Sequence, residues 1–202
     1  MTDARESYAA VIVAGGRGRR MADASKPLVT VGGRTILRRV LDAVPGARPR
    51  IVVGDIAPAD DYLVTAEEPP GSGPAYAAAA GLAEVPDSVP LVAVLAADLP
   101  FLDADAISAL ARALRTGEHD GAVLVDEDGH RQWLCGLWRA EALRGAAQHA
   151  RPGSGMRHML GRLAIADVFL DGRVVAPWFD CDTPQALALA RRLADEDPDA
   201  GS

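Results

Sequence analysis

The sequence predicts a three-layer α/β/α sandwich, in which a mostly parallel sheet is covered by helices on both faces. Short apolar runs alternate with helical patterns along the chain, and this order is typical of parallel strands joined by helical crossovers. The clearest runs, Tyr8–Ala14 and Leu91–Ala97, are apolar throughout, as strands are when both of their faces are buried. No internal repeat and no long polar linker divides the chain, so we expect a single domain over residues 1–202.

Each element is predicted from its local pattern. Strands are expected at short apolar or β-branched runs: Tyr8–Ala14, Arg50–Val53, Tyr62–Thr65, Leu91–Ala97, Gly121–Val125, Gln132–Trp138 and Ala164–Phe169, with a further extended piece at Arg173–Val175. Helices are expected where apolar residues recur at helical spacing or where capping residues begin a run: Thr35–Val44, Pro74–Ala83, Asp103–Leu114, Ala140–His149, Met156–Leu160 and Thr183–Leu193. Pro74 suits a first helical turn and Thr183 an N-cap. Asp126–Gly129 reads as the turn of a hairpin, and the acidic tail from Asp195 is expected to fray.

Composition narrows the class of protein. The 202 residues are 49% apolar and 24% charged, a balance that excludes a disordered chain or a disulfide scaffold. The net charge of −7 argues against a nucleic-acid partner, which needs a basic face. No apolar run approaches the ~20 residues of a membrane-spanning helix, and Met1–Ser7 is polar rather than a secretory signal. Only Cys135 and Cys181 are present, which suits a reducing compartment, so we expect a cytoplasmic protein without a membrane partner.

The single lysine stands out. Of the 21 basic residues, Lys26 is the one lysine and the others are arginines. Arginine has replaced lysine wherever a plain cation serves, so Lys26 is a candidate for a role that needs a compact, flexible ammonium. The alternative is that the one lysine stands at this position by chance.

A glycine-rich, basic segment follows the first predicted strand. It reads Gly15-Gly16-Arg17-Gly18-Arg19-Arg20-Met21, and Ser25-Lys26-Pro27 comes shortly after it. The glycines allow the backbone to approach an anion and to turn its N–H groups toward it. Ligands of open α/β sheets bind beyond the carboxyl ends of the strands, and this is the most basic patch of an acidic chain. The segment therefore predicts a triphosphate site, with a flexible surface loop as the alternative.

Two familiar phosphate-binding motifs are absent. A Walker loop requires Gly-Lys-Ser/Thr, whereas Ser25 precedes Lys26. A dinucleotide fingerprint requires a third glycine, and Gly16-Arg17-Gly18 is followed by two arginines and a methionine.

Asp98 directly follows the predicted strand Leu91–Ala97 and precedes Leu99-Pro100. A carboxylate at the carboxyl end of a buried strand lies at the ligand-binding edge of the sheet. Reactions of triphosphates need Mg²⁺, which prefers one or two carboxylates together with phosphate oxygens and water. We therefore expect Asp98 to bind the metal. The alternative, a helix cap, is better filled by Asp103.

Further polar and aromatic residues have weaker assignments. Asp180 and Asp182 alternate on an extended segment, which places both carboxylates on one face, although one of them could cap the helix that begins at Thr183. Trp133 and Trp138 are expected to pack in the core rather than to stack on a substrate. The histidines are scattered without the spacing of metal ligands, and no Ser/His/Asp or Cys/His arrangement is evident.

The segment VIVAGGRGRRM…SKPLVTVGGRTILRRVLDAV resembles the signature of the sugar-nucleotide and cofactor nucleotidyltransferases. Within that superfamily it is most similar to the molybdenum cofactor guanylyltransferases. The resemblance continues through GSGPAYAAAAGL, AADLPFL and DCDTPQAL, and so covers nearly the whole chain. It implies a Rossmann-like, GT-A-like nucleotidyltransferase fold. The nucleotide-binding half would span about residues 8–100 and the acceptor-binding half about 101–194, before a tail at 195–202.

The resemblance also implies roles for individual residues. Lys26, Asp98 and Arg20 would be catalytic, with Asp98 as the metal ligand. The nucleotide-binding residues that it implies are Val13, Ala14, Gly15, Gly16, Arg17, Gly18, Arg19, Arg20, Lys26, Glu68 and Asp98. Glu68 stands at the position of a family aspartate, with an exposed acidic turn as the alternative, and Asp180 and Asp182 would lie near the acceptor. Ala22 and Ser25 depart from the glycine and aspartate that relatives often carry.

The implied reaction is Mg²⁺-dependent transfer of GMP from GTP to a phosphorylated small molecule, with molybdopterin as the preferred acceptor and pyrophosphate as the second product. The double glycine of Ala14-Gly15-Gly16 favours guanine, because cytidylyl relatives tend to carry Ala-Ala-Gly. A cytidylyltransferase for the same cofactor and a transferase to a sugar phosphate or phospholactate remain alternatives. A non-catalytic nucleotide-binding module is the alternative from another class.

Overall fold

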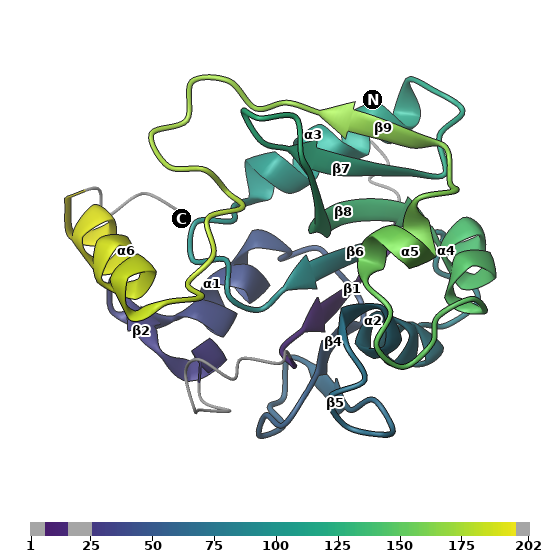
Figure 1. Ribbon diagram of the computed structural model, residues 1–202, viewed down its shortest axis with the longest axis horizontal. Helices are drawn as coiled ribbons and strands as arrows, with labels where there is room; N and C mark the ends of the chain where they lie inside the picture. Colours follow the sequence, from purple (N-terminus) through teal and green to yellow (C-terminus); the bar gives the residue numbers. More distant parts are fainter. Residues whose placement is uncertain (1–6, 16–25, 197–202) are drawn as a thin grey trace.

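The computed structural model describes residues 7–15 and 26–196. A seven-stranded sheet in the order β5-β4-β1-β6-β8-β7-β9 runs through the molecule (Figure 1). Its strands are β1 Tyr8–Val13, β4 Arg50–Val53, β5 Leu63–Thr65, β6 Leu91–Ala96, β7 Gly121–Val125, β8 Arg131–Arg139 and β9 Ile165–Val168. Of these seven strands, β8 alone is antiparallel to its neighbours. The predicted α/β class with a mostly parallel sheet is confirmed.

Helices cover both faces of this sheet (Figure 1). They are α1 Ile36–Ala43, α2 Pro74–Ala83, α3 Ala104–Arg115, α4 Ala140–Ala147 and α5 Met156–Leu160. A further helix, α6 Pro184–Glu196, lies to one side of the sheet. Ala10 and Ile12 of β1 belong to the core beneath α1 and α3. Val11 and Val13, which alternate with them, belong to the core beneath α2, α4 and α5. Because β1 is buried on both faces, its sequence is apolar at every position.

Most of the predicted elements are confirmed, with small shifts at their ends. Thr35 caps α1, Asp103 caps α3, and the Thr183 hydroxyl accepts a hydrogen bond from the N–H of Ala186 at the start of α6. The prediction of an extended piece at Arg173–Val175 is wrong, because no strand forms there and Val174 is exposed. Helix α6 continues to Glu196, so Asp195 is helical rather than part of a frayed tail.

A small hairpin escaped the sequence-based prediction. The short helix η1 Lys26–Leu28 leads into β2 Thr30–Val31, which pairs with β3 Arg34–Thr35. Gly32 and Gly33 form its turn with φ angles of 55° and 75°, a region that favours glycine. Helix α6 lies beside β2, and the Arg191 side chain donates a hydrogen bond to the Thr30 carbonyl (Figure 1). Helix α6 is thereby joined to the hairpin that follows Lys26.

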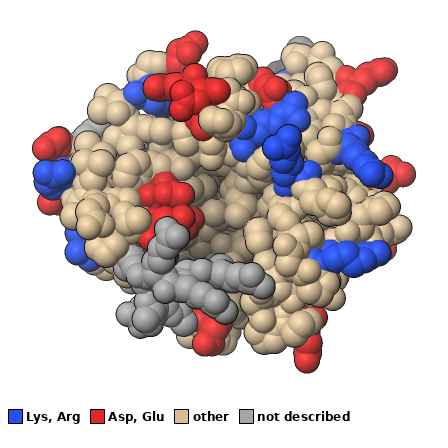
Figure 2. Space-filling model, viewed as in Figure 1, with Lys and Arg blue, Asp and Glu red and all other residues tan. Residues whose placement is uncertain are grey.

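The carboxyl ends of the parallel strands and the amino end of β8 lie along one edge of the sheet. The molecule is visibly hollowed near the centre of the face that Figure 2 presents, with acidic groups on one side of the hollow and basic groups on another. No helix among residues 7–15 and 26–196 is long and apolar enough to cross a bilayer.

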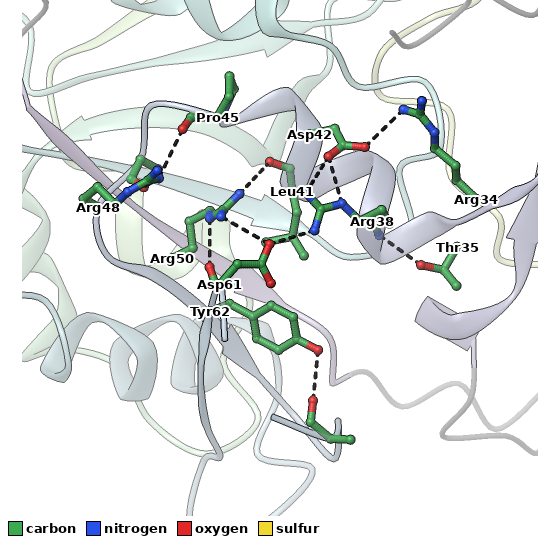
Figure 3. Close-up of polar contacts among 12 residues, drawn as sticks. Arg34, Thr35, Arg38, Leu41, Asp42, Pro45, Arg48, Arg50, Asp61 and Tyr62 are labelled. Atoms are coloured by element: carbon green, nitrogen blue, oxygen red, sulfur yellow. Dashed lines mark hydrogen bonds and ion pairs between the residues drawn. The ribbon is translucent and has the colours of Figure 1, made fainter. Parts of the chain in front are cut away.

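Arginines also join surface elements to one another. Arg38 of α1 pairs with Asp42 one turn later and with Asp61, which precedes β5, at 2.7 Å in both cases. Asp61 also pairs with Arg50 of β4 at 3.2 Å (Figure 3). The hydrogen bond from Arg38 holds the pKa of the Asp61 carboxyl below its usual value. Each exposed ion pair of this kind contributes little to stability. Because the pairs share Arg38 and Asp61, we interpret them as a structural network that joins α1 to the edge of the sheet.

Gly81 lies where α2 approaches the sheet most closely. A Cβ at this position would lie 2.5 Å from Cγ1 of Val11 and 2.7 Å from Cγ2 of Val53, both buried. We expect Gly81→Ala to lower the free energy of unfolding by about 1–2 kcal/mol, because overpacking outweighs the gain of up to ~1 kcal/mol in helix propensity. Gly145 in α4 is the matched control, since a Cβ there meets no atom within 4 Å. Gly145→Ala should therefore be neutral or stabilising in urea denaturation, and equal effects of the two substitutions would contradict the packing argument.

Candidate active site

The turn after β1 is held between the ends of two neighbouring strands. The N–H of Ala14 donates to the carbonyl of Val53 at 2.8 Å, and the N–H of Ala97 donates to the carbonyl of Val13 at 3.0 Å. Gly54, with a φ of 150°, packs against this turn, and a Cβ on it would lie 3.2 Å from the nitrogen of Gly15. The start of the glycine-rich segment is therefore fixed by the sheet. Gly16, Arg17, Gly18, Arg19 and Arg20 lie outside the described residues.

A carboxylate that the sequence pattern did not single out lies beside this turn. Glu67, shortly after β5, is 7% exposed, and its Oε1 accepts a hydrogen bond from the N–H of Gly71 at 3.0 Å. The same oxygen lies 3.6 Å from the position that a Cβ on Gly15 would take. Glu68, the residue that the resemblance singled out, is exposed instead. The structure thus brings Glu67, rather than Glu68, to the turn at Gly15.

Lys26 and two carboxylates meet at the same edge of the sheet. The Nζ atom of Lys26 lies 2.9 Å from Oδ2 of Asp98 and 2.5 Å from Oδ1 of Asp182. Asp98 follows the end of β6, whereas Asp182 precedes α6, so the contacts join residues 72 and 156 positions apart in sequence. A single ammonium therefore occupies the space between two carboxylates, at a place where a cation is clearly accommodated.

The segment before α6 is fixed against the end of β6 by backbone and core contacts. The N–H of Cys181 donates to the carbonyl of Asp98 at 3.2 Å. The Cys181 side chain is buried in a small core with Ile36 and Phe101, and Phe101 packs edge-on against Phe179 with ring centroids 5.8 Å apart. Because Cys181 points into this core, its neighbours Asp180 and Asp182 point the other way, as alternation along an extended segment predicts.

The charges at this edge influence one another. Burial lowers the pKa of Lys26, but the hydrogen bond to Asp182 and the charge of Asp98 outweigh it, so the pKa lies above its usual value. Partial burial, together with the charges of Asp182 and Asp98, raises the pKa of Asp180. Lys26 is thus positively charged at neutral pH, and the carboxylates around it outnumber it. Further positive charge at this place would be stabilised.

The cysteines do not contribute a nucleophile. Burial raises the pKa of the Cys135 thiol to about 12 and that of the Cys181 thiol to about 11. Both groups are therefore protonated at neutral pH, and a thiol is neither a strong nucleophile nor a metal ligand in that form.

A pocket of about 380 Å³ opens beside the carboxylates (Figure 2). It is lined by Pro74, Ala96, Asp98, Leu99, Arg131, Gln132, Trp133, Leu134, Cys135, Met156, Trp178, Asp180 and Asp182. The expectation that Trp138 packs in the core is confirmed, since it is fully buried. Trp133 packs against the core as well, and it also lines the pocket. Trp178 and Met156, which no sequence pattern singled out, line it as well.

A family model described as the MobA-like NTP transferase domain matches residues 10–168 of the chain, a range that includes Lys26 and Asp98. A molybdenum cofactor guanylyltransferase of Bradyrhizobium sp. (strain ORS 278) is 32% identical, over 94% of this chain and 95% of that protein.

Solved structures show the same fold at lower identity. The molybdopterin-guanine dinucleotide biosynthesis protein A of Archaeoglobus fulgidus superposes with a TM-score of 0.73 at 16% identity, covering 93% of this chain and 98% of that one. The 2-C-methyl-D-erythritol 4-phosphate cytidylyltransferase of Thermus thermophilus superposes with a TM-score of 0.68 at 21% identity, covering 92% and 98%. The architecture is therefore shared by enzymes that differ in both base and acceptor.

Proposed function

This chain belongs to the MobA-like NTP transferase family and is a nucleotidyltransferase; from that premise we propose that it transfers GMP from GTP to molybdopterin and releases pyrophosphate. The observation that carries the proposal is the convergence of Lys26, Asp98 and Asp182 beside the turn at Gly15. A triphosphate needs cations and backbone N–H groups, and a metal needs carboxylates. Of these groups, Lys26, Asp98 and the turn at Gly15 lie at the edge where the parallel strands end, which supports the proposal.

The proposed reaction is an in-line displacement at phosphorus. An oxygen of the terminal phosphate of the acceptor attacks the α-phosphorus of GTP and forms the new P–O bond. The bond from the α-phosphorus to the oxygen that bridges to the β-phosphorus breaks, and pyrophosphate leaves with that oxygen. The attacking phosphate is already ionised, so no protein nucleophile is needed, in keeping with the protonated cysteines. Catalysis then rests on positioning and on the stabilisation of charge.

We assign Lys26, Arg17, Arg19 and Arg20 to the triphosphate. The ammonium of Lys26 is flexible and charged, and it lies at the edge of the sheet where the parallel strands end, which supports this assignment. The three arginines precede it in the chain, in the segment that continues from Gly15. Together these groups would offset the charge that builds on the departing pyrophosphate.

We assign Asp98 to the divalent metal, with Mg²⁺ as the ion. Among the described residues, no three His, Cys, Asp or Glu side chains converge to form a metal cage. A hard cation held by one or two carboxylates, phosphate oxygens and water does not need such a cage, and the oxygens of Asp98 and Asp182 flank a position that already holds the Lys26 ammonium. When bound there, Mg²⁺ would supply positive charge that offsets the negative charge of the phosphates.

We place the nucleotide on residues from about 8 to 100 and the acceptor on residues from about 101 to 194. Asp98 and the turn at Gly15 belong to the first half, whereas Asp180 and Asp182 belong to the second. The pocket is lined by residues of both halves, and Asp98 is one of them. This lining supports a reaction centre between the two halves.

The base preference is expected to follow the order GTP, then CTP, then ATP in Mg²⁺-dependent binding. Guanine presents two adjacent donors, N1–H and the 2-amino group, and the Glu67 carboxylate beside Gly15 offers two acceptor oxygens. Adenine lacks the 2-amino group, and an unpaired buried polar group costs ~1–3 kcal/mol, so ATP should bind roughly ten- to a hundred-fold more weakly than GTP. Titration calorimetry with the three nucleotides measures this order.

A matched pair of variants tests the residue that reads the base. We expect Glu67→Gln to weaken GTP binding and to narrow the preference over ATP. The exposed neighbour is the control, since Glu68→Gln should bind GTP as the parent protein does. If CTP binds most tightly, the base assignment passes to cytosine while the phosphate and metal roles stand. If GTP binds but no acceptor phosphate releases pyrophosphate, the chain is a nucleotide-binding module and the proposed function is wrong.

A further inference from the structure

The ammonium of Lys26 already occupies the carboxylates beside which we place the metal. Its Nζ atom lies 2.9 Å from Oδ2 of Asp98 and 2.5 Å from Oδ1 of Asp182. The Lys26 side chain is only 19% exposed, so the ammonium is largely enclosed between its two partners. A divalent cation that used either oxygen would lie beside this ammonium, and like charges in contact repel each other. Lys26 and a divalent metal therefore compete for these carboxylates.

The ammonium can leave the carboxylates without any change of fold. The backbone beside it is fixed, since the N–H of Val29 donates to the carbonyl of Lys26 at 3.2 Å, and the N–H of Ile36 donates to the carbonyl of Val29 at 3.0 Å. Pro27, the next residue, is buried. The four-carbon stem of a lysine is flexible, so rotation of this side chain alone moves the ammonium. Lys26 is charged at neutral pH and therefore gives up the carboxylates by moving, not by losing its proton.

A bound triphosphate would offer the ammonium another partner. The proposed function assigns Lys26 to the phosphates and Asp98 to the metal, and both roles cannot be filled while the ammonium lies between the two carboxylates. Anionic phosphate oxygens would attract the ammonium away from Asp98 and Asp182. The carboxylates would then lack a cationic partner, a state that favours the binding of a hard divalent cation. Nucleotide binding and metal binding would thus strengthen each other.

We propose that Lys26 blocks the metal-binding carboxylates in the nucleotide-free chain and releases them when its ammonium moves to the triphosphate. This inference rests on the proposed function and adds an order to it. The nucleotide-free chain binds a divalent metal weakly, and the carboxylates of Asp98 and Asp182 become available once the triphosphate has bound Lys26. The same side chain thereby serves the phosphates and prevents the metal from binding without them.

The first test measures metal binding to the nucleotide-free chain, with Mn²⁺ as a spectroscopic substitute for Mg²⁺. Free Mn²⁺ is quantified by electron paramagnetic resonance as the full chain is titrated. We expect Lys26→Met, which nearly keeps the length of the side chain but removes its charge, to bind Mn²⁺ about five-fold or more tightly than the parent chain. Addition of Asp98→Asn to this variant should abolish the gain. Arg38→Met is the matched control, because Arg38 also joins two carboxylates, those of Asp42 and Asp61, at 2.7 Å each. It should leave Mn²⁺ binding unchanged.

The second test observes the ammonium directly in the parent chain. Lysine labelled with ¹³C at Cε gives a single side-chain resonance, because Lys26 is the one lysine of the sequence. We expect this resonance to shift when an α,β-methylene analogue of GTP is added in the presence of a chelator, since the ammonium exchanges carboxylates for phosphates without any metal. No substitution of Lys26 is needed, so this measurement stays decisive if Lys26→Met fails to fold.

The outcomes separate this inference from the proposed function. Mn²⁺ binding to Lys26→Met that is no tighter than in the parent chain would overturn the inference, as would a gain that survives Asp98→Asn or that Arg38→Met shares. A Lys26 resonance that no nucleoside triphosphate analogue shifts would also overturn it, even if GMP transfer is observed. Tighter Mn²⁺ binding together with a shifted resonance supports the inference. If pyrophosphate is then released with no acceptor phosphate, the inference stands and the proposed transfer is refuted.

Discussion

Asp98→Asn is expected to abolish measurable turnover, with a loss of about a thousand-fold in kcat, while the fold stays intact. The substitution removes the negative charge and replaces one carboxylate oxygen with an NH2 group, which cannot bind a cation. The carbonyl of Asp98 still accepts the hydrogen bond from Cys181, and the asparagine side chain has nearly the same shape, so the local structure should persist. Pyrophosphate release measured over a range of Mg²⁺ concentrations tests this prediction.

Asp61→Asn is the control for the loss of an aspartate. Asp61 lies in the surface network with Arg38 and Arg50, away from the pocket lining, so its substitution should leave turnover unchanged (Figure 3). Thermal unfolding of both variants should stay close to that of the parent chain. Near-normal pyrophosphate release by Asp98→Asn at low Mg²⁺ would remove the metal assignment.

Lys26→Arg should impair turnover about a hundred-fold although the charge is kept. The Nζ atom lies between Asp98 and Asp182, at 2.9 and 2.5 Å, a position that a point-like ammonium fills and a planar guanidinium overfills. The guanidinium would pair with one carboxylate through its fork and hold the side chain away from the phosphates. Steady-state kinetics should show the loss mainly in kcat, because binding through net charge is retained.

The opposite exchange on the surface is the matched control. Arg38→Lys keeps its charge beside Asp42 and Asp61, where exposed pairs contribute little, so activity should be unchanged and stability should shift by less than about 0.5 kcal/mol. Lys26→Arg turning over like the parent enzyme would mean that the one lysine of this chain reflects composition rather than function.

Elements whose limits depend on nearby residues were predicted closely. Helix α2 spans Pro74–Ala83 and strand β4 spans Arg50–Val53, as the sequence indicated, because proline in a first turn and a β-branched run act locally. The wrong prediction at Arg173–Val175 is of another kind. A short run with strand-like residues forms a strand only when a neighbouring strand is available to pair with it, and this requirement is not local.

The meeting of Lys26 with Asp98 could be anticipated for a general reason. Parallel strands place their carboxyl ends on one edge, so the loops after β1 and β6 had to approach each other once the class of fold was known. The position of the second carboxylate, Asp182, could not be predicted in this way. It depends on the contacts of Cys181 with Asp98 and with the small core under α6. Those contacts span most of the chain.

The sequence by itself determined the α/β class, the limits of most elements and the edge at which Lys26 and Asp98 lie, because periodicity, capping and strand polarity are local properties. The tertiary structure alone decided that Glu67 rather than Glu68 faces Gly15 and that Trp133 lines the pocket, where a bulge shifts the register between β7 and β8. Glu67 and Glu68 are identical neighbours in an irregular segment, so only the direction of their side chains distinguishes them. A bulge arises from the mismatch between two paired strands. Both depend on packing between distant parts of the chain, which no local pattern records.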